Sequence, residues 1–146
     1  MKQLFLFTIC CAMMIAVHAQ TIKLDYFSKV PAKISNCGAQ YTYDTISLKK
    51  KNYILLVDFQ DIGLISVAGK TVSLTLMNTK LSDKTISVST YKGSGYTVTL
   101  AVKTGETLGK ADLEDGTLEV SRGNAHLSLK IHGQSSCGGS KQEKNR

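Results

Sequence analysis

GTLEVSRGNAHLSLKIHGQSSC, residues 116–137, is the stretch that most strongly indicates the architecture of this chain. Apolar residues occupy every second position on both sides of its Gly123-Asn124 pair. Alternation with a period of two around a Gly-Asn turn is typical of a β-hairpin. The stretch ends at Cys137, a hundred residues after Cys37. We therefore expect a closing hairpin that is tied back to the opening of the fold.

Residues 1–19 have the pattern of a secretory signal peptide. Lys2 gives a positive start, an apolar run covers residues 4–17, and Ala19 ends a small-residue cleavage pattern. The apolar run is too short to span a bilayer and polar, strand-like sequence follows it, so no transmembrane segment is expected after signal removal. Cleavage after Ala19 predicts a secreted or periplasmic product.

Two cysteines, Cys37 and Cys137, remain after this cleavage. An even pair in an exported protein is most simply a disulfide, although two free thiols are the alternative. Chain-entropy estimates give a bond across about a hundred residues a stabilisation of roughly 4–5 kcal/mol. The sequence therefore predicts a disulfide between Cys37 and Cys137.

Further strands are expected between these cysteines. The alternation recurs over residues 71–77, 85–91 and 96–103, with turn residues between the runs. Residues 53–59 (YILLVDF) are apolar on both faces, which predicts a central strand that is covered on both sides. Residues 41–48 (YTYDTISL) are expected to form one more strand.

Two segments are expected to lack strand structure. Residues 78–84 are polar and turn-like, and residues 104–115 (TGETLGKADLED) contain two glycines and no clear period. The second segment is the longest internal loop that the sequence indicates, and loops of this length are often functional.

Such a series of strands has to close into a barrel or fold into a sandwich to bury its apolar face. We predict one all-β domain over residues 20–137, an antiparallel β-barrel or sandwich of about eight or nine strands closed by one disulfide. The sequence pattern leaves barrel and sandwich open. Residues 138–146 are polar and are expected to form a flexible tail that can be removed at little cost.

No catalytic, cofactor or metal site is expected. His126 and His132 are the imidazole bases that remain after signal cleavage, and both are interpreted as exposed strand residues. Asp112, Glu114 and Asp115 supply the oxygen ligands that Ca²⁺ prefers, but they lack the spacing of a known calcium loop and are read as an acidic turn. We therefore predict that the protein is not an enzyme.

The charge of the chain does not predict nucleic-acid binding. The formal net charge is +7, yet no basic stripe is interleaved with aromatic residues and no known nucleic-acid motif is present. A small, rigid β scaffold usually functions through its loops or its interior. We expect binding of another protein in the extracytoplasmic space through the loops, with inhibition or toxin neutralisation as special cases. A β-barrel that binds a small apolar ligand, which requires an interior cavity, and an envelope-associated structural protein are the alternatives.

The segment YKGSGY at residues 91–96 and the positions of the two cysteines carry a family resemblance. The layout resembles the periplasmic inhibitors of c-type lysozyme, small exported β-barrels in which an early cysteine pairs with one near the C-terminus. That family carries a Ser-Gly-x-x-Tyr motif and a later Tyr…Lys-Gly motif that enter the lysozyme cleft. Here a tyrosine follows Ser-Gly directly, and Tyr-Lys-Gly comes before it. The resemblance implies that Tyr91, Lys92, Ser94 and Tyr96 bind the partner.

Overall fold

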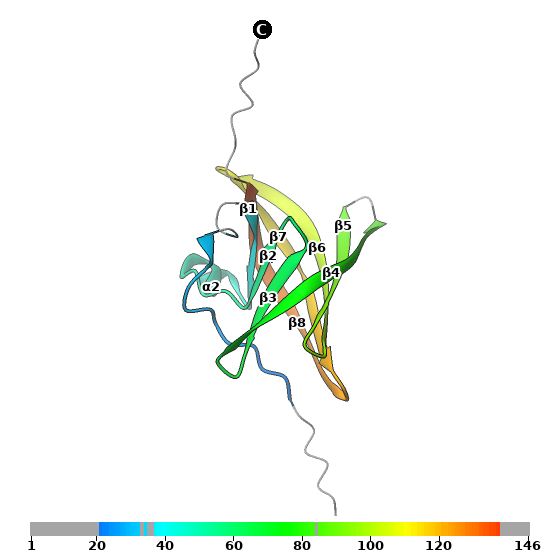
Figure 1. Ribbon diagram of the computed structural model, residues 1–146. Helices are drawn as coiled ribbons and strands as arrows, with labels where there is room; N and C mark the ends of the chain where they lie inside the picture. Colours follow the sequence, from blue (N-terminus) through cyan, green and yellow to red (C-terminus); the bar gives the residue numbers. More distant parts are fainter. Residues whose placement is uncertain (1–20, 33, 35–36, 84, 138–146) are drawn as a thin grey trace, which may run out of the picture.

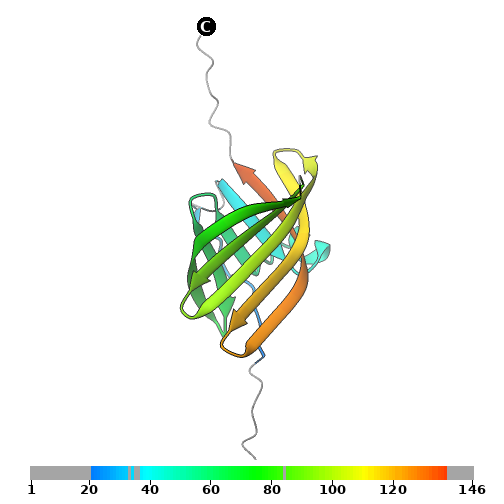
Figure 2. The same cartoon turned by 90° about the vertical axis from the view of Figure 1, so that its right-hand side faces the viewer.

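Eight antiparallel strands form one closed barrel (Figure 1, Figure 2). The computed structural model describes residues 21–137, except residues 33, 35–36 and 84. Each strand pairs with its neighbours in the sequence, and the last strand pairs with the first. The strands are β1 (Cys37–Thr42), β2 (Leu55–Asp58), β3 (Ile62–Val67), β4 (Lys70–Asp83), β5 (Ile86–Gly93), β6 (Tyr96–Leu108), β7 (Ala111–Arg122) and β8 (Ala125–Cys137).

The predicted all-β fold is confirmed, and the choice between barrel and sandwich is resolved in favour of the barrel. Because β8 pairs with β1, the sheet has no free edge strand. The predicted signal peptide and the predicted C-terminal tail lie outside the described residues. Within residues 21–137 as described, no helix is long and apolar enough to cross a membrane.

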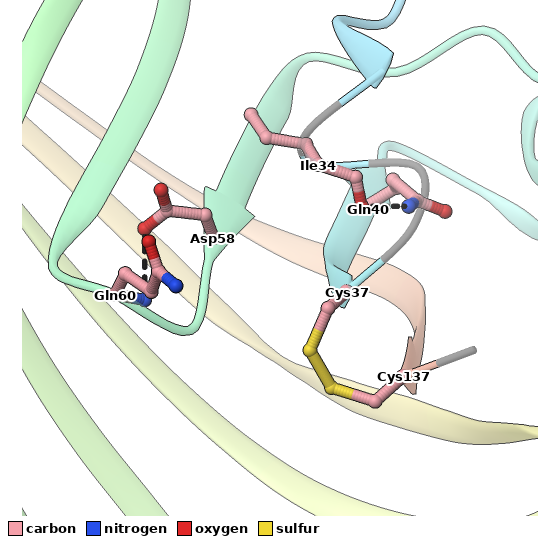
Figure 3. The surroundings of a disulfide bond; sticks show 6 residues. All are labelled: Ile34, Cys37, Gln40, Asp58, Gln60 and Cys137. Carbon is pink, nitrogen blue, oxygen red and sulfur yellow. Dashed lines mark hydrogen bonds between the residues drawn. A yellow bond between two sulfur atoms is a disulfide. The ribbon is translucent and has the colours of Figure 1, made fainter. Parts of the chain in front are cut away.

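The predicted disulfide is confirmed, and it lies at one end of the ladder that closes the barrel (Figure 3). Cys37 at the start of β1 is directly opposite Cys137 at the end of β8. The turns between β2 and β3, β4 and β5, and β6 and β7 lie at this end, because they follow the strands that run in this direction. We call it the disulfide end and the other the opposite end.

The predicted turn at Gly123-Asn124 is confirmed between β7 and β8, and two further tight turns lie at this opposite end. Ala68-Gly69 joins β3 to β4, and Ser94-Gly95 joins β5 to β6. In each pair both residues have positive φ, 51° and 72° in the first and 50° and 80° in the second. Two consecutive residues of this kind form the type I′ turn, whose twist matches that of the flanking strands.

A second apolar layer covers the outer face of β2, as the two-sided apolar pattern predicts. Leu55 and Val57 point into the barrel, whereas Tyr53 and Leu56 form an outer cluster with Ile34. Residues 21–30 cover this cluster after passing the opposite end, where the Asp25 amide donates to the Ser66 carbonyl (2.8 Å) (Figure 1).

The prediction of a strand over residues 41–48 is wrong in its second half. The strand β1 ends at Thr42, and a short helix, α2 (Thr45–Lys49), follows. Asp44 is the N-cap of this helix, and its Oδ1 accepts a hydrogen bond from the Ser47 amide (2.7 Å). An aspartate at this position satisfies backbone donors that a strand would have paired across the sheet, so local capping overrides the alternation.

The two segments predicted to lack strands are strand in the structure. Residues 104–115 form the end of β6 and the start of β7, joined at Gly109-Lys110. A register shift between Thr104 and Thr107 breaks the alternation, which explains why the sequence suggested a loop. Residues 78–83 continue β4, also with register shifts, and their polarity reflects exposure on both sides.

Because the disulfide clamps the closing ladder, Cys37→Ser and Cys137→Ser should each lower the free energy of unfolding by the same amount. The upper estimate is roughly 4–5 kcal/mol. The measurement is urea unfolding of the two single variants and of the double variant under oxidising conditions. The double variant should lose no more stability than either single one, and unequal single losses would contradict a shared role.

Candidate functional site

The half of the barrel interior toward the opposite end is filled with apolar side chains. Ile65, Leu74, Val98, Leu118 and Val120 are each at most 1% exposed. Such complete burial of branched aliphatic side chains is typical of a packed core. This half therefore forms the packed core of the barrel.

Toward the disulfide end, the interior opens into a cavity of about 300 Å³. The cavity lies between β1, β2, the β2–β3 turn, β4, β5, β6 and β7, and its wall mixes apolar and polar side chains. The lining residues are Ala39, Tyr41, Val57, Asp58, Phe59, Asp61, Leu76, Thr79, Ser87, Ser89, Tyr91, Leu100, Val102, Thr104 and Glu114. The barrel is thus half core and half pocket.

One row of residues across three strands builds the β1–β7 side of the pocket. Tyr41 on β1 is opposite Gly133 on β8, and Gly133 is opposite Glu114 on β7. Since Gly133 has no side chain, the Tyr41 ring lies over it, and the Tyr41 hydroxyl donates to Glu114 Oε2. The Ser135 hydroxyl donates to the other carboxylate oxygen, Oε1 (2.8 Å). Glu114 is therefore held in one orientation inside the barrel.

Tyr91 on β5 forms another part of the pocket wall. It is 4% exposed, and its ring packs against Gly63 on β3. Burial raises the pKa of Tyr91 to about 12; Asp58, Asp61 and Glu114 also raise it, and a hydrogen bond with Ser89 partly offsets the increase. Burial also raises the pKa of Tyr41 well above its usual value, with further contributions from Glu114 and Tyr91.

Asp58, the last residue of β2, and Asp61, in the turn between β2 and β3, lie at the rim of the pocket. Asp58 is buried, and its Oδ1 accepts a hydrogen bond from the Gln60 amide (3.0 Å) (Figure 3). The same oxygen accepts a second hydrogen bond from the Ile62 amide (2.8 Å). Asp61 is exposed and has a φ of 96°. Asp58 thus fixes the turn that carries Asp61.

The four residues expected to bind a partner protein divide into two pairs. Tyr91 and Tyr96 are buried inside the barrel, where Tyr91 lines the pocket and Tyr96 belongs to the core. The guanidinium of Arg122 lies 4.8 Å from the centre of the Tyr96 ring. Lys92 and Ser94 are exposed at the opposite end of the barrel. The structure therefore does not bring the four together on one surface.

The histidines and the acidic segment lie mainly outside the pocket. His126 is exposed, and His132 Nδ1 lies 2.5 Å from Asp115 Oδ1. Asp112 accepts a hydrogen bond from the Thr107 hydroxyl, so the clustered acidic residues have different neighbours. Among the described residues, no group of three or more His, Cys, Asp or Glu side chains is placed to hold a metal ion.

The sequence did not predict that Tyr41 and Glu114 line a pocket, and it placed Glu114 in an acidic turn. Glu114 is an even number of positions from Leu118 and Val120, so the three side chains are expected on the same face of the strand, and Leu118 and Val120 face the barrel interior. The sequence would therefore have indicated an inward-facing glutamate if residues 104–115 had been predicted as a strand. Tyr41 was correctly predicted on a strand, but its hydrogen-bond partner Glu114 was placed in the predicted loop.

Comparison of this chain with protein-family models, curated proteins and solved structures found no match.

Gly133→Ala should disturb the pocket because a Cβ atom there would lie 2.2 Å from Cδ1 of Tyr41. We expect a loss of about 1–3 kcal/mol in the free energy of unfolding, the usual cost of overpacking. Gly105→Ala is the matched control in a strand, since its Cβ would meet only the Leu113 carbonyl oxygen at 3.5 Å. Urea unfolding of both variants tests this, and equal stability of the two would contradict it.

The stability of the protein should fall as the pH rises from 10 to about 12. The pKa of Tyr91 is higher in the folded chain than its ordinary value of 10, so the unfolded chain loses this proton at lower pH. The contribution of the protonated Tyr91 hydroxyl to stability is complete below pH 10, and it is lost as the pH rises past the pKa of Tyr91 in the folded chain. Denaturant unfolding across this range checks it, and Tyr91→Phe should show a shallower decline. An equally steep decline in that variant would contradict the role of Tyr91.

Proposed function

We propose that this protein is a non-enzymatic binding protein that holds one small amphipathic molecule in the pocket at the disulfide end. The observation that carries the proposal is the cavity of about 300 Å³ between Tyr41, Tyr91 and Glu114. An eight-stranded barrel is just wide enough to be filled by side chains or to hold one small ligand. Here the fixed side chains fill only one half.

The size and lining of the pocket support a small ligand. Ligand pockets span about 300–1,000 Å³ and combine apolar walls with a few placed polar groups. Leu76, Leu100 and Val102 supply apolar wall, and Ser87 and Ser89 add hydroxyl groups. The volume lies at the lower end of the range, which favours a compact molecule over a long lipid chain.

Exposed apolar side chains around the disulfide end support access from this side. Phe59, Leu81 and Leu108 are 54%, 76% and 71% exposed. They belong to or lie near the β2–β3, β4–β5 and β6–β7 turns. Apolar residues around an opening offer a first contact to an amphipathic molecule.

The proposal includes export and leaves a separate role for the opposite end. A disulfide is typical of oxidising compartments, which agrees with the signal-peptide pattern at residues 1–19.

Protein binding as in the lysozyme inhibitors would use the exposed turn at Lys92 and Ser94. Because this turn and the pocket lie at different ends, a protein partner and a small ligand would not compete.

Titration with 2-phenylethanol, followed by amide NMR spectra of the full mature chain, tests the proposed function. Shifts should concentrate on the strands that line the cavity. Val102→Phe, which adds volume inside the pocket, should abolish them. Val88→Phe is the matched control because residue 88 is on the same sheet but alternates with the pocket residues Ser87 and Ser89.

The outcomes separate a pocket from nonspecific contact. Retained binding in the Val88 variant with loss in the Val102 variant supports the pocket, provided that both variants unfold cooperatively. Absence of any saturable shift in the parent protein, or equal binding by both variants, contradicts the proposal.

A further inference from the structure

The pocket has a charge opposite to that of the chain. Three acidic residues, Asp58, Asp61 and Glu114, line it, and none of its described lining residues is Lys, Arg or His. The whole chain has 18 Lys and Arg against 11 Asp and Glu. From this composition, a pocket lining with more basic than acidic residues would be expected. The acidic lining therefore distinguishes the pocket from the chain as a whole.

The three carboxyl groups act on the same space from different sides. Glu114 lines it from β7, whereas Asp58 lines it from the end of β2 and Asp61 from the β2–β3 turn. The charges of all three contribute to the raised pKa of the Tyr91 hydroxyl, in agreement with their positions around the same cavity. A positive group placed there would be attracted by all three.

Glu114 retains the capacity to bind a donor from a ligand. An ionised carboxylate offers about four acceptor positions. The hydroxyls of Tyr41 and Ser135 use one on each oxygen. A protonated amine can donate to the remaining positions, and the adjacent tyrosine rings offer faces that attract a cation.

The apolar wall restricts what else the ligand contains. Val57, Leu76, Leu100 and Val102 line the cavity beside these polar groups. They match a hydrocarbon or aromatic body, which a simple inorganic cation lacks. A fatty acid matches the wall but would place its carboxylate beside three others, and like charges repel strongly in a site of low dielectric.

We propose that the pocket selects small molecules that carry one basic amino group on an apolar or aromatic body. This inference rests on the proposed small-molecule binding and specifies the chemical class of the ligand.

Three probes with the same aromatic body and different head groups test the inference: 2-phenylethylamine, 2-phenylethanol and 3-phenylpropanoate. Their affinities are measured at neutral pH by NMR titration of the full mature chain. The amine should bind about tenfold more tightly than the alcohol, the effect of a charge-assisted hydrogen bond relative to a neutral one. The carboxylate should bind more weakly than the alcohol.

Two variants assign the preference to the acidic groups. Glu114→Gln should remove most of the amine's advantage over the alcohol, since the shape of the side chain is kept and its charge is lost. Asp61→Asn, at the exposed rim, should reduce the advantage less and serves as a second variant if Glu114→Gln does not fold.

The outcomes distinguish this inference from the proposed function. Equal binding of the three probes, or tightest binding of the carboxylate, overturns the amine preference but keeps the pocket as a binding site. An amine preference that persists in both variants overturns the role of the carboxylates. Binding of none of the probes overturns both proposals.

Discussion

The pairing of β1 with β8 is the constraint on which the rest of the structure depends. The other neighbouring strands follow one another in the sequence, so their pairings are mostly local, whereas this ladder joins residues about a hundred positions apart. Closing so long a loop has an entropic cost that local hairpins do not share. The pairing also sets Tyr41 over Gly133 and thereby brings its hydroxyl to Glu114. Closure of the sheet and formation of the pocket wall are therefore the same event.

The open half of the barrel exists because of the residues that face inward there. In the filled half the inward positions carry branched aliphatic side chains such as Leu74 and Leu118. In the open half they include Ser87 and Ser89, whose short side chains cannot reach the barrel axis. Placing the Glu114 carboxylate inside the barrel would be unfavourable without hydrogen-bond partners. The hydroxyl groups of Tyr41 and Ser135 donate to it and offset part of the desolvation cost. The pocket is thus maintained by small side chains and by one satisfied carboxylate.

The sequence predicted the features that depend on a regular period or on simple chemistry. Alternation indicated the strands around residues 71–77 and 96–103, and the two cysteines that follow the expected signal peptide indicated the disulfide. The pattern failed where a local interaction interrupts it, as at the Asp44 helix cap and at the register shift after Thr104. The pocket was harder to predict because an inward position is known only after the register is known. A short serine inside a barrel gives the same sequence pattern as an exposed one.

The segment over residues 21–30 has a consequence for the movement of any bound molecule. Leu24 is 2% exposed and belongs to the interior core cluster at the opposite end, and the Tyr43 hydroxyl donates to its carbonyl oxygen (2.7 Å). Among the described residues, this segment and the packed half of the core close the barrel at the opposite end. The small molecule proposed above would then enter and leave through the same opening at the disulfide end, so a second molecule could not displace the first by following it through.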